Sequence, residues 1–353
     1  MKILYIGHAV PSSTSRHRAD ALIRLGHEVK LADPYVALAT QLRGKLSGAL
    51  HYRTGYRLMQ GAVRAWVDVL LRQHAGWPQL VWVNGGELIG SLAAHKLRQF
   101  AAPLVLYNND DPTGGRDGRR FDSLLAALNA YDLCAVLREP NVDEFLAQGA
   151  RAVHRVWMSY DEVLHRPFDN IADIPAAYKS EVAFIGTWMP KERRDEFMLS
   201  LIKQGVPLSI WGDAWQRSPN WLQIKHCWRG QSIYGRDYVA AVQGAKIALG
   251  LLSKGNRDLH TTRSAEIPYA GGLLCAQRTS EHLQMYKEGE EAVFWNDAEE
   301  CAAVCHSLLA DDALRERIRI NGNDRAKVAD FGHEAVLSHL IKKLFACRME
   351  KLC

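Results

Sequence analysis

Residues 1–7, MKILYIG, form an apolar run that ends in glycine. A polar loop follows, then an amphipathic stretch at 19–26 and a second apolar run at 28–33. An apolar run, a helix and another apolar run predict the β-α-β opening of a parallel sheet. Further strands are expected at 80–83, 104–107, 133–136 and 153–157. Six strands joined by stretches long enough for crossovers predict one doubly wound, Rossmann-like domain.

The same pattern begins again after residue 180. Residues 182–186, VAFIG, mirror the first strand, and later apolar runs alternate with helical stretches at 208–212, 245–252, 272–276 and 292–295. The sequence therefore predicts an α/β protein in which two Rossmann-like domains face each other across a cleft. The expected parts are an N-terminal domain at 1–165, a proline-containing linker at 166–180, a C-terminal domain at 181–334 and a helix at 335–353 that crosses back to the domain junction.

Composition narrows the class of protein without naming a function. The 353 residues are 48% hydrophobic, which suffices for two cores, and no run approaches the roughly 18 apolar residues of a membrane span. With no secretory signal pattern, we expect a cytoplasmic location. The seven cysteines contain no C-x-x-C pair, so we expect free, mostly buried thiols and no metal site. A net charge of +5 suits anionic ligands but does not indicate nucleic-acid binding.

The loop after residue 252 is the richest in candidate binding groups. It places cations and hydroxyls just before a helix whose first N–H groups favour an anion, which predicts a cradle for a diphosphate. Glu266, inside that helix, could accept two hydrogen bonds from a ribose diol. The alternative is an exposed ion-pair cluster with Glu266 in solvent. The candidate donor-binding residues of the loop are Lys254, Arg257, His260, Thr262 and Arg263.

Residues 263–272, RSAEIPYAGG, resemble the R-x-x-E-I-x-A-x-G signature of CgeB-like (spore-maturation type) glycosyltransferases. Within them, 266–271 is similar to the E-x-x-x-x-G segment of family 1-like, GT-B glycosyltransferases. Other segments occur in the family's order: NDDP at 109–112, FIGT at 184–187, LSIWG at 208–212 and YKEGEEA at 286–292. The resemblance implies a GT-B glycosyltransferase with a nucleotide-sugar co-substrate, in which Glu266 holds the donor ribose. No second acidic cluster completes a metal site there, and the cations of the donor loop could neutralise a leaving diphosphate without Mg²⁺, so we expect a metal-independent enzyme without a cofactor.

Two positions depart from the family's pattern. Retaining members with the E-x7-E motif carry a glutamate where this sequence has Asp258, and they place an arginine where it has Thr187. Lys191 or Arg194 could supply the missing cation. The stereochemical outcome therefore stays open.

Two glycines that end strands of the C-terminal half are also donor-site candidates. Gly186 and Gly212 fit a close approach of the backbone to the nucleotide. A glycine at the end of a strand is as often only a turn.

Candidate acceptor-side residues follow strands of the N-terminal half. His8 comes directly after the first strand, where some inverting GT-B enzymes carry a histidine general base. An aspartate at Asp110 or Asp111 could orient it. The alternative is that His8 caps a strand and that Asp110-Asp111-Pro112 begins a turn.

Residues 41–74 contain six Arg or Lys residues and one acid, Asp68, among apolar side chains. As a helix, this segment could contact an anionic membrane from the cytoplasmic side or a lipid-diphosphate acceptor. A solvated basic helix packed on the sheet is the alternative. The expected partners are a nucleotide-sugar donor and a glycan, lipid-linked or small-molecule acceptor, with no nucleic acid.

Four other functions are alternatives to sugar transfer. A nicotinamide-dependent oxidoreductase is disfavoured because residues 7–11, GHAVP, lack a G-x-G-x-x-G motif. A nucleotide-sugar epimerase or a phosphorylase of the same fold cannot be distinguished by fold alone. A catalytically silent nucleotide-sugar-binding protein is the alternative from another class. Synthesis of a surface glycan or glycoconjugate is the favoured role.

Overall fold

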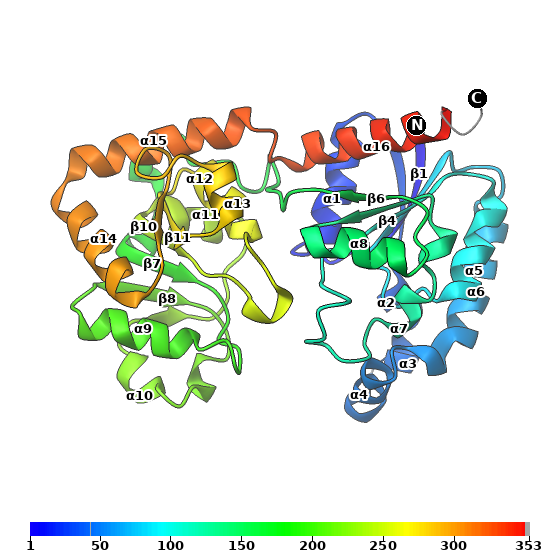
Figure 1. Cartoon of the computed structure of the whole chain (residues 1–353), viewed down its shortest axis with the longest axis horizontal. Helices are drawn as coiled ribbons and strands as arrows, with labels where there is room; N and C mark the ends of the chain where they lie inside the picture. The colour runs from blue at the N-terminus through cyan, green and yellow to red at the C-terminus, as the bar shows by residue number, and fades with distance from the viewer. Residues whose placement is uncertain (43, 350–353) are drawn as a thin grey trace. The chain divides into compact units, whose positions relative to one another are not determined.

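In a computed structural model of the chain, residues 1–42 and 44–349 are described (Figure 1). Arg43 of the predicted basic segment and residues 350–353 of the predicted C-terminal helix lie outside the described residues. The chain forms two compact units. The first contains Met1–Trp157 together with the chain from His333 onward, and the second contains Met158–Gly332.

The first unit is built on a six-stranded parallel sheet. Its strands are β1 (Lys2–Ile6), β2 (Glu28–Ala32), β3 (Leu80–Asn84), β4 (Leu104–Tyr107), β5 (Leu133–Val136) and β6 (Val153–Arg155), in the spatial order β2-β1-β3-β4-β5-β6. Central strands are covered on both faces, and Ile3, Leu4 and Tyr5 are fully buried. Burial on both faces is why these strands appear as unbroken apolar runs. The direction of winding reverses between β1 and β3, which is where ligands bind in such sheets.

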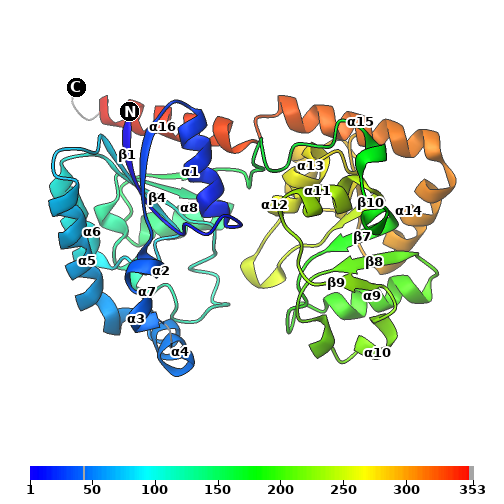
Figure 2. The same ribbon diagram turned by 180° about the vertical axis from the view of Figure 1, so that it is seen from behind.

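Helices cover both faces of this sheet. They are α1 (Thr14–Arg24), α2 (Pro34–Ala37), α3 (Ala39–Leu42), α4 (Lys45–Arg53), α5 (Gln60–Gln73), α6 (Ser91–Leu97), α7 (Asp122–Leu125), α8 (Glu139–Ala147) and α16 (His333–Met349). Ser13 caps α1, since its hydroxyl accepts the N–H of Arg16. The C-terminal helix α16 packs along α1, whereas α5 and α6 pack together on the other side of the sheet (Figures 1 and 2).

The second unit repeats the plan with another six-stranded parallel sheet. Its strands are β7 (Ser180–Ile185), β8 (Leu208–Trp211), β9 (Trp228–Gly230), β10 (Ala245–Gly250), β11 (Leu274–Gln277) and β12 (Val293–Trp295), in the order β12-β11-β10-β7-β8-β9. The winding reverses between β7 and β10. The loops that follow these two strands are therefore the place to look for a ligand.

The helices of the second unit are α9 (Arg194–Lys203), α10 (Trp221–Ile224), α11 (Gly235–Gln243), α12 (Thr262–Tyr269), α13 (Ser280–Met285), α14 (Ala298–Ala310) and α15 (Asp312–Val328). Helix α12 packs against α15, and α14 packs against α9. Residues 166–180, expected as a linker, lie inside this unit and form two 3-10 turns, Ile171–Asp173 and Ala176–Tyr178.

The prediction of two Rossmann-like sheets is confirmed, with one strand missed. Strand β9 has only three residues, its Arg229 is exposed, and its register with β8 is irregular. Its residues Trp228, Arg229 and Gly230 include only one large apolar side chain, so they form no apolar run in the sequence. Five cysteines of the described chain are free and buried, and they are Cys134, Cys227, Cys275, Cys301 and Cys305.

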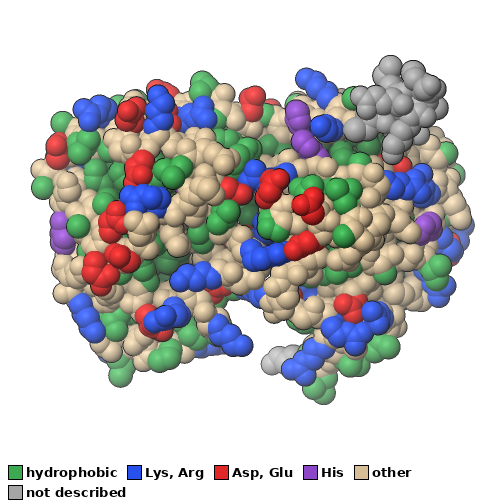
Figure 3. Space-filling model, in the orientation of Figure 1, with side chains coloured by type: hydrophobic (Ala, Val, Ile, Leu, Met, Phe, Trp, Pro, Cys, Tyr) green, Lys and Arg blue, Asp and Glu red, His purple; other side chains and the backbone are tan. Residues whose placement is uncertain are grey.

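The charged side chains on the surface match the similar numbers of basic and acidic residues in the sequence. Lys and Arg side chains are interspersed with Asp and Glu over the face seen in Figure 3. Within 1–42 and 44–349, no helix combines the length and the apolar character needed to cross a bilayer.

Candidate functional site

The loops after β7 and β10 are joined by one buried carboxylate. Glu192, 7% exposed, lies in the loop after β7. Its carboxylate accepts hydrogen bonds from the Ser253 hydroxyl at 3.1 Å, the Lys254 N–H at 2.9 Å and the Gly255 N–H at 3.3 Å. These bonds fix the start of the loop after β10. Sequence reasoning missed Glu192 because its partners are distant along the chain.

Backbone strain gathers in the same two loops. Lys191 has φ +70°, Arg193 has φ +55° and Arg257 has φ +52°. Non-glycine residues seldom adopt this left-handed region, and it persists only where the surroundings hold it. Strain of this kind concentrates at binding sites. Two of the three, Lys191 and Arg257, are predicted donor-binding residues.

Helix α13 holds the far end of the loop. His260 is buried, accepts the Met158 N–H on Nε2 at 2.9 Å and donates from Nδ1 to the Glu281 carboxylate. The Thr279 hydroxyl donates to the Leu259 carbonyl at 2.6 Å. Both ring nitrogens of His260 are therefore engaged inside the protein. The prediction that His260 binds the donor is wrong, and its role is to anchor the loop.

The first turn of α12 is held by a chain of hydrogen bonds. The Thr261 N–H donates to the Ser264 hydroxyl at 3.0 Å, and that hydroxyl donates to Nε2 of His282 at 2.7 Å. Nδ1 of His282 donates to the Gln277 carbonyl at 2.6 Å. Burial lowers the pKa of His282 to about 4, so the ring is neutral and can accept from Ser264. This chain orients the α12 terminus, where Thr262 and Arg263 lie.

Glu266 lies one turn further along α12 and is 3% exposed. Its carboxylate is paired with Arg263, and His165 Nε2 lies 3.8 Å away. The Arg263 guanidinium stacks over the Tyr238 ring at 4.4 Å. Burial alone would raise the pKa of Glu266, but Arg263 and His165 outweigh it and hold the pKa below its ordinary value. Glu266 is therefore an ionised acceptor in a fixed position.

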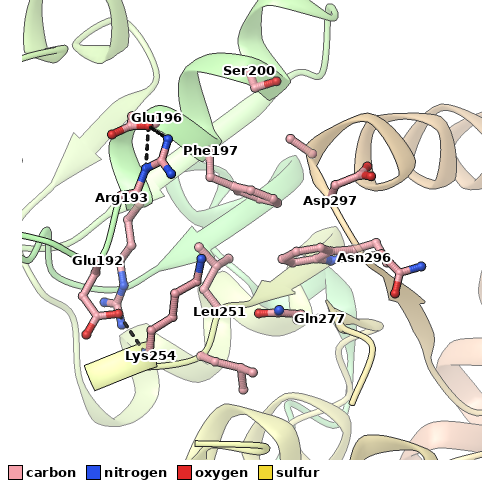
Figure 4. Close-up of a pocket in the computed structure, with 14 residues that line it drawn as sticks. Glu192, Arg193, Glu196, Phe197, Ser200, Leu251, Lys254, Gln277, Asn296 and Asp297 are labelled. Carbon is pink, nitrogen blue, oxygen red and sulfur yellow. Dashed lines mark hydrogen bonds and ion pairs between the residues drawn. The ribbon is translucent and has the colours of Figure 1, made fainter. Parts of the chain in front are cut away.

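A cavity of about 410 Å³ opens beside these loops (Figure 4). Two helix N-termini, of α9 and α14, contribute to its wall, as do Arg194 and Lys254 of the predicted donor set. The rings of Phe197 and Trp295 line it together, with centroids 4.6 Å apart. The cavity thus has an aromatic wall, which suits a ring-shaped ligand, and its charged lining is mixed, with Glu192, Glu196 and Asp297 beside the cations.

The glycines that follow β7 and β8 have a packing role. Gly212 has φ +155°, and a Cβ there would lie 2.1 Å from the carbonyl oxygen of Gly186. The Thr187 carbonyl accepts a hydrogen bond from Arg194 at 2.8 Å. The close approach made possible by Gly212 is therefore to the loop after β7. Asp258 is 8% exposed within the loop after β10.

In the first unit, the partner of His8 differs from the one expected. Nδ1 of His8 lies 3.2 Å from the Asp33 carboxylate, which also accepts the Ala9 N–H at 2.7 Å. Asp33 follows β2, the strand that pairs with β1. The prediction that Asp110 or Asp111 orients His8 is wrong. Asp111 is buried and accepts from Asn141 at 2.8 Å.

A second acidic group lies near His8 and was not predicted. The Tyr35 hydroxyl donates to the Glu87 carboxylate at 2.8 Å, and the Tyr35 ring lies 5.0 Å from the His8 ring. Arg120 pairs with Glu87 and lies 3.9 Å from Asp110. Burial raises the pKa of Glu87, and Arg120 opposes this rise. Glu87 comes shortly after β3, so a search of every loop that follows a strand would have found it.

Solved structures share this architecture over almost the whole chain. Anabaena HepE, in a complex with UDP and glucose, is 14% identical with a TM-score of 0.66, covering 98% of this chain and 100% of that one. Sucrose-phosphate synthase from Thermosynechococcus elongatus is 15% identical with a TM-score of 0.66 and the same coverage. The UDP-forming α,α-trehalose-phosphate synthase from Burkholderia vietnamiensis is 13% identical with a TM-score of 0.62, covering 98% of this chain and 100% of that chain. The fold is GT-B.

Sequence comparison gives a family match over part of the chain. Residues 193–342 match the family described as "Glycosyl transferase-like", and this match includes the loop after β10 and α12. No curated protein matches the sequence significantly. The matched family and the fold together support a glycosyltransferase. The narrower CgeB-like resemblance stays a prediction.

Proposed function

We propose that this GT-B protein transfers a sugar from a nucleotide-diphospho-sugar to a hydroxyl acceptor. The observation that carries the proposal is the pair of loops after β7 and β10, joined by Glu192 at the point where the winding of the sheet reverses. The loop after β10 lies within the matched glycosyl transferase-like region, which begins at residue 193, directly after Glu192. We propose a uridine diphosphate sugar as donor, because HepE binds UDP and glucose and the trehalose-phosphate synthase is UDP-forming.

The donor would be held by the second unit. Arg194, Lys254 and Arg257 would neutralise the diphosphate together with the N-terminus of α12, where Thr262 lies. Glu266 would accept hydrogen bonds from the ribose hydroxyls, and Arg263 keeps it ionised for that task. These cations would stabilise the leaving diphosphate without a metal ion. We accordingly propose that transfer is independent of metal and needs no cofactor.

The acceptor would be activated by the first unit. Nδ1 of His8 donates to Asp33, so Nε2 would accept the proton of the attacking hydroxyl. The His8 side chain is 42% exposed and can meet a substrate. Direct attack assisted by a base inverts the anomeric configuration. An inverted product would therefore support His8 as the base, and a retained one would exclude this role.

A catalytically silent nucleotide-sugar-binding protein is the second candidate. It is favoured by Thr187 and Asp258, which stand where the resembled family has an arginine and a glutamate. Both candidates bind the donor, but only a transferase releases nucleoside diphosphate in the presence of an acceptor.

The first test is a thermal-shift screen against UDP-, GDP-, TDP- and CMP-sugars, with and without EDTA. We expect stabilisation by a UDP-sugar that EDTA does not change. Glu266→Gln should weaken that stabilisation, whereas Glu316→Gln, which changes an exposed glutamate on α15, should not. Equal stabilisation of both variants would contradict the ribose role. If the protein binds a UDP-sugar but releases no UDP with any acceptor, the catalytically silent binding protein is favoured.

We further propose a role in the synthesis of a surface glycan or glycoconjugate, with peripheral contact to an anionic membrane through 41–74. Leu46, Leu50 and Leu58 are exposed in this segment, and basic side chains at Arg53 and Arg57 accompany them. Exposed apolar and basic groups together favour an anionic lipid surface. Co-sedimentation with phosphatidylglycerol vesicles should be lost in a Leu46→Ser, Leu50→Ser, Leu58→Ser variant. Unchanged sedimentation would refute the contact.

A further inference from the structure

Three buried thiols meet in the interior of the second unit. Cys275 lies on β11, and Cys301 and Cys305 lie one helical turn apart on α14. Their sulfur atoms all lie within 4.8 Å of one another, and all three residues are fully buried. The sequence shows no C-x-x-C pair, so this cluster arises only when the strand and the helix pack together. Nothing in the proposed sugar transfer uses it.

The spacing of the sulfurs fits coordination of one central atom. Bonds of about 2.3 Å to sulfur place two sulfurs roughly 4 Å apart at a planar trigonal centre and roughly 3.4 Å apart at a pyramidal one. The three sulfur atoms lie within 4.8 Å of one another, which is close to this range. Cys301 and Cys305 are at i and i+4, so both sulfurs leave the same face of α14.

The surroundings decide which atom the site would take. The cysteines belong to a buried apolar cluster that also contains Leu249 of β10, Leu273 just before β11 and Leu308 of α14. Among the described residues, the cluster contains no fourth His, Cys, Asp or Glu ligand. Zinc prefers four ligands and would leave a net negative charge on three thiolates in this dry interior. Trivalent arsenic takes three sulfurs, needs no fourth ligand and forms a neutral complex.

We propose that Cys275, Cys301 and Cys305 form a binding site for a trivalent, thiophilic metalloid, with arsenite as the probe. Arsenous acid, As(OH)3, would react with three thiols to give As(S-Cys)3 and three water molecules. Three As–O and three S–H bonds break, three As–S bonds form, each hydroxide leaves with a thiol proton, and no atom changes oxidation state.

The test uses the full chain with Cys347→Ser and Cys353→Ser, because those two side chains lie outside the described ones. The protein is incubated with sodium arsenite and a thiol-free phosphine reductant, then measured by native mass spectrometry. We expect one arsenic atom per chain, gained with loss of three hydrogens. Cys275→Ser, Cys301→Ser or Cys305→Ser should each abolish it at the arsenite concentration that saturates the parent.

Two buried cysteines outside the cluster provide the matched controls. Cys134→Ser and Cys227→Ser should bind arsenite as the parent does. If a cluster variant fails to fold, alkylation of the arsenite-treated parent after denaturation and acid quench settles the question by peptide mapping. Protection of all three cluster cysteines supports the site. Absence of bound arsenic, protection of fewer than three, or binding that survives the substitutions overturns it.

Discussion

Gly212 and Gly230 form a matched pair for testing how the loop after β7 is positioned. Gly212 follows β8 with φ +155°, and Gly230 ends β9 with φ +153°. A Cβ at Gly212 would lie 2.1 Å from the Gly186 carbonyl oxygen, whereas a Cβ at Gly230 would meet nothing within 4 Å. Replacement by Ala therefore brings the same backbone strain to both positions but a steric clash to only one.

The expected losses of stability follow from these two effects. A non-glycine residue in this backbone conformation costs about 1–3 kcal/mol at either position. The clash at Gly212 is with a backbone oxygen, so no side-chain rotation relieves it, and overpacking adds about 1–3 kcal/mol. We expect Gly212→Ala to be less stable than Gly230→Ala by about 2 kcal/mol. For a unit of this size, this difference lowers the melting temperature by about 4–8 °C.

Calorimetry of both variants measures the difference in stability. A UDP titration then shows whether the substitution also changes nucleotide binding. Gly186 begins the loop that carries Glu192, so a displaced Gly186 should disturb the loop after β10 as well. We expect Gly212→Ala to weaken UDP binding about tenfold, equivalent to about 1.4 kcal/mol, and Gly230→Ala to leave it nearly unchanged. Equal melting temperatures would refute the packing role of Gly212. Unequal stability with equal UDP affinity would separate this packing from the donor site.

Three further predictions concern the contacts described above. Glu192→Ala should lower the free energy of unfolding by about 3 kcal/mol, because three hydrogen bonds are lost. The control Glu316→Ala, at an exposed glutamate, should lower it by less than about 1 kcal/mol. Similar urea midpoints for the two variants would contradict this prediction. The pKa of His282 is lower in the folded protein than in the unfolded chain, so the unfolded chain takes up the proton at a higher pH. The folded state therefore loses stability as the pH falls from about 6.5 towards 4. Between pH 7 and pH 5 the free energy of unfolding should fall by about 2 kcal/mol. His282→Gln should remove that part of the pH dependence in denaturation curves, and an unchanged slope would exclude it. Asp33→Asn should lower turnover about a hundredfold without changing donor affinity if it orients His8, and near-normal turnover would remove the pair from catalysis.

The fold was largely predictable because its strands are buried on both faces. Apolar runs such as 1–7 and 182–186 are almost sufficient by themselves to identify strands, since neither face of these strands is polar. Strand β9 has no such run because its three residues are Trp228, the exposed Arg229 and Gly230. Its place in the sheet depends on β8, a contact that periodicity does not reveal.

The pairing of His8 could have been inferred from the order of the strands. Ile6 and Ala32 are partners in the parallel pair of β1 and β2, so the residues that follow them emerge at the same edge of the sheet. Asp33 is the residue directly after Ala32. The aspartates at 110 and 111 follow β4, which is two strands away from β1. Adjacency in the sheet was therefore a better guide than acidity alone.

The residues around the predicted donor site differ in how much of their role the local sequence shows. Lys254 and Arg257 stay predictions, made because they are cations in the loop after β10. His260 was misassigned because its role depends on Glu281 and the Met158 backbone, which no local pattern brings near it. Glu192 was missed for the same reason, since its partners begin at Ser253.

These misassigned and missed residues share one physical function, which is to hold the loop after β10 in place before any ligand arrives. Glu192 fixes its start, His260 and Thr279 fix its end, and His282 orients the first turn of α12. A loop held at both ends loses little conformational entropy on binding, so more of the interaction energy with a donor becomes affinity. Amide hydrogen exchange should therefore find the Lys254 and Gly255 N–H groups protected without nucleotide, and rapid exchange of both in the free protein would contradict a loop that is ordered in advance.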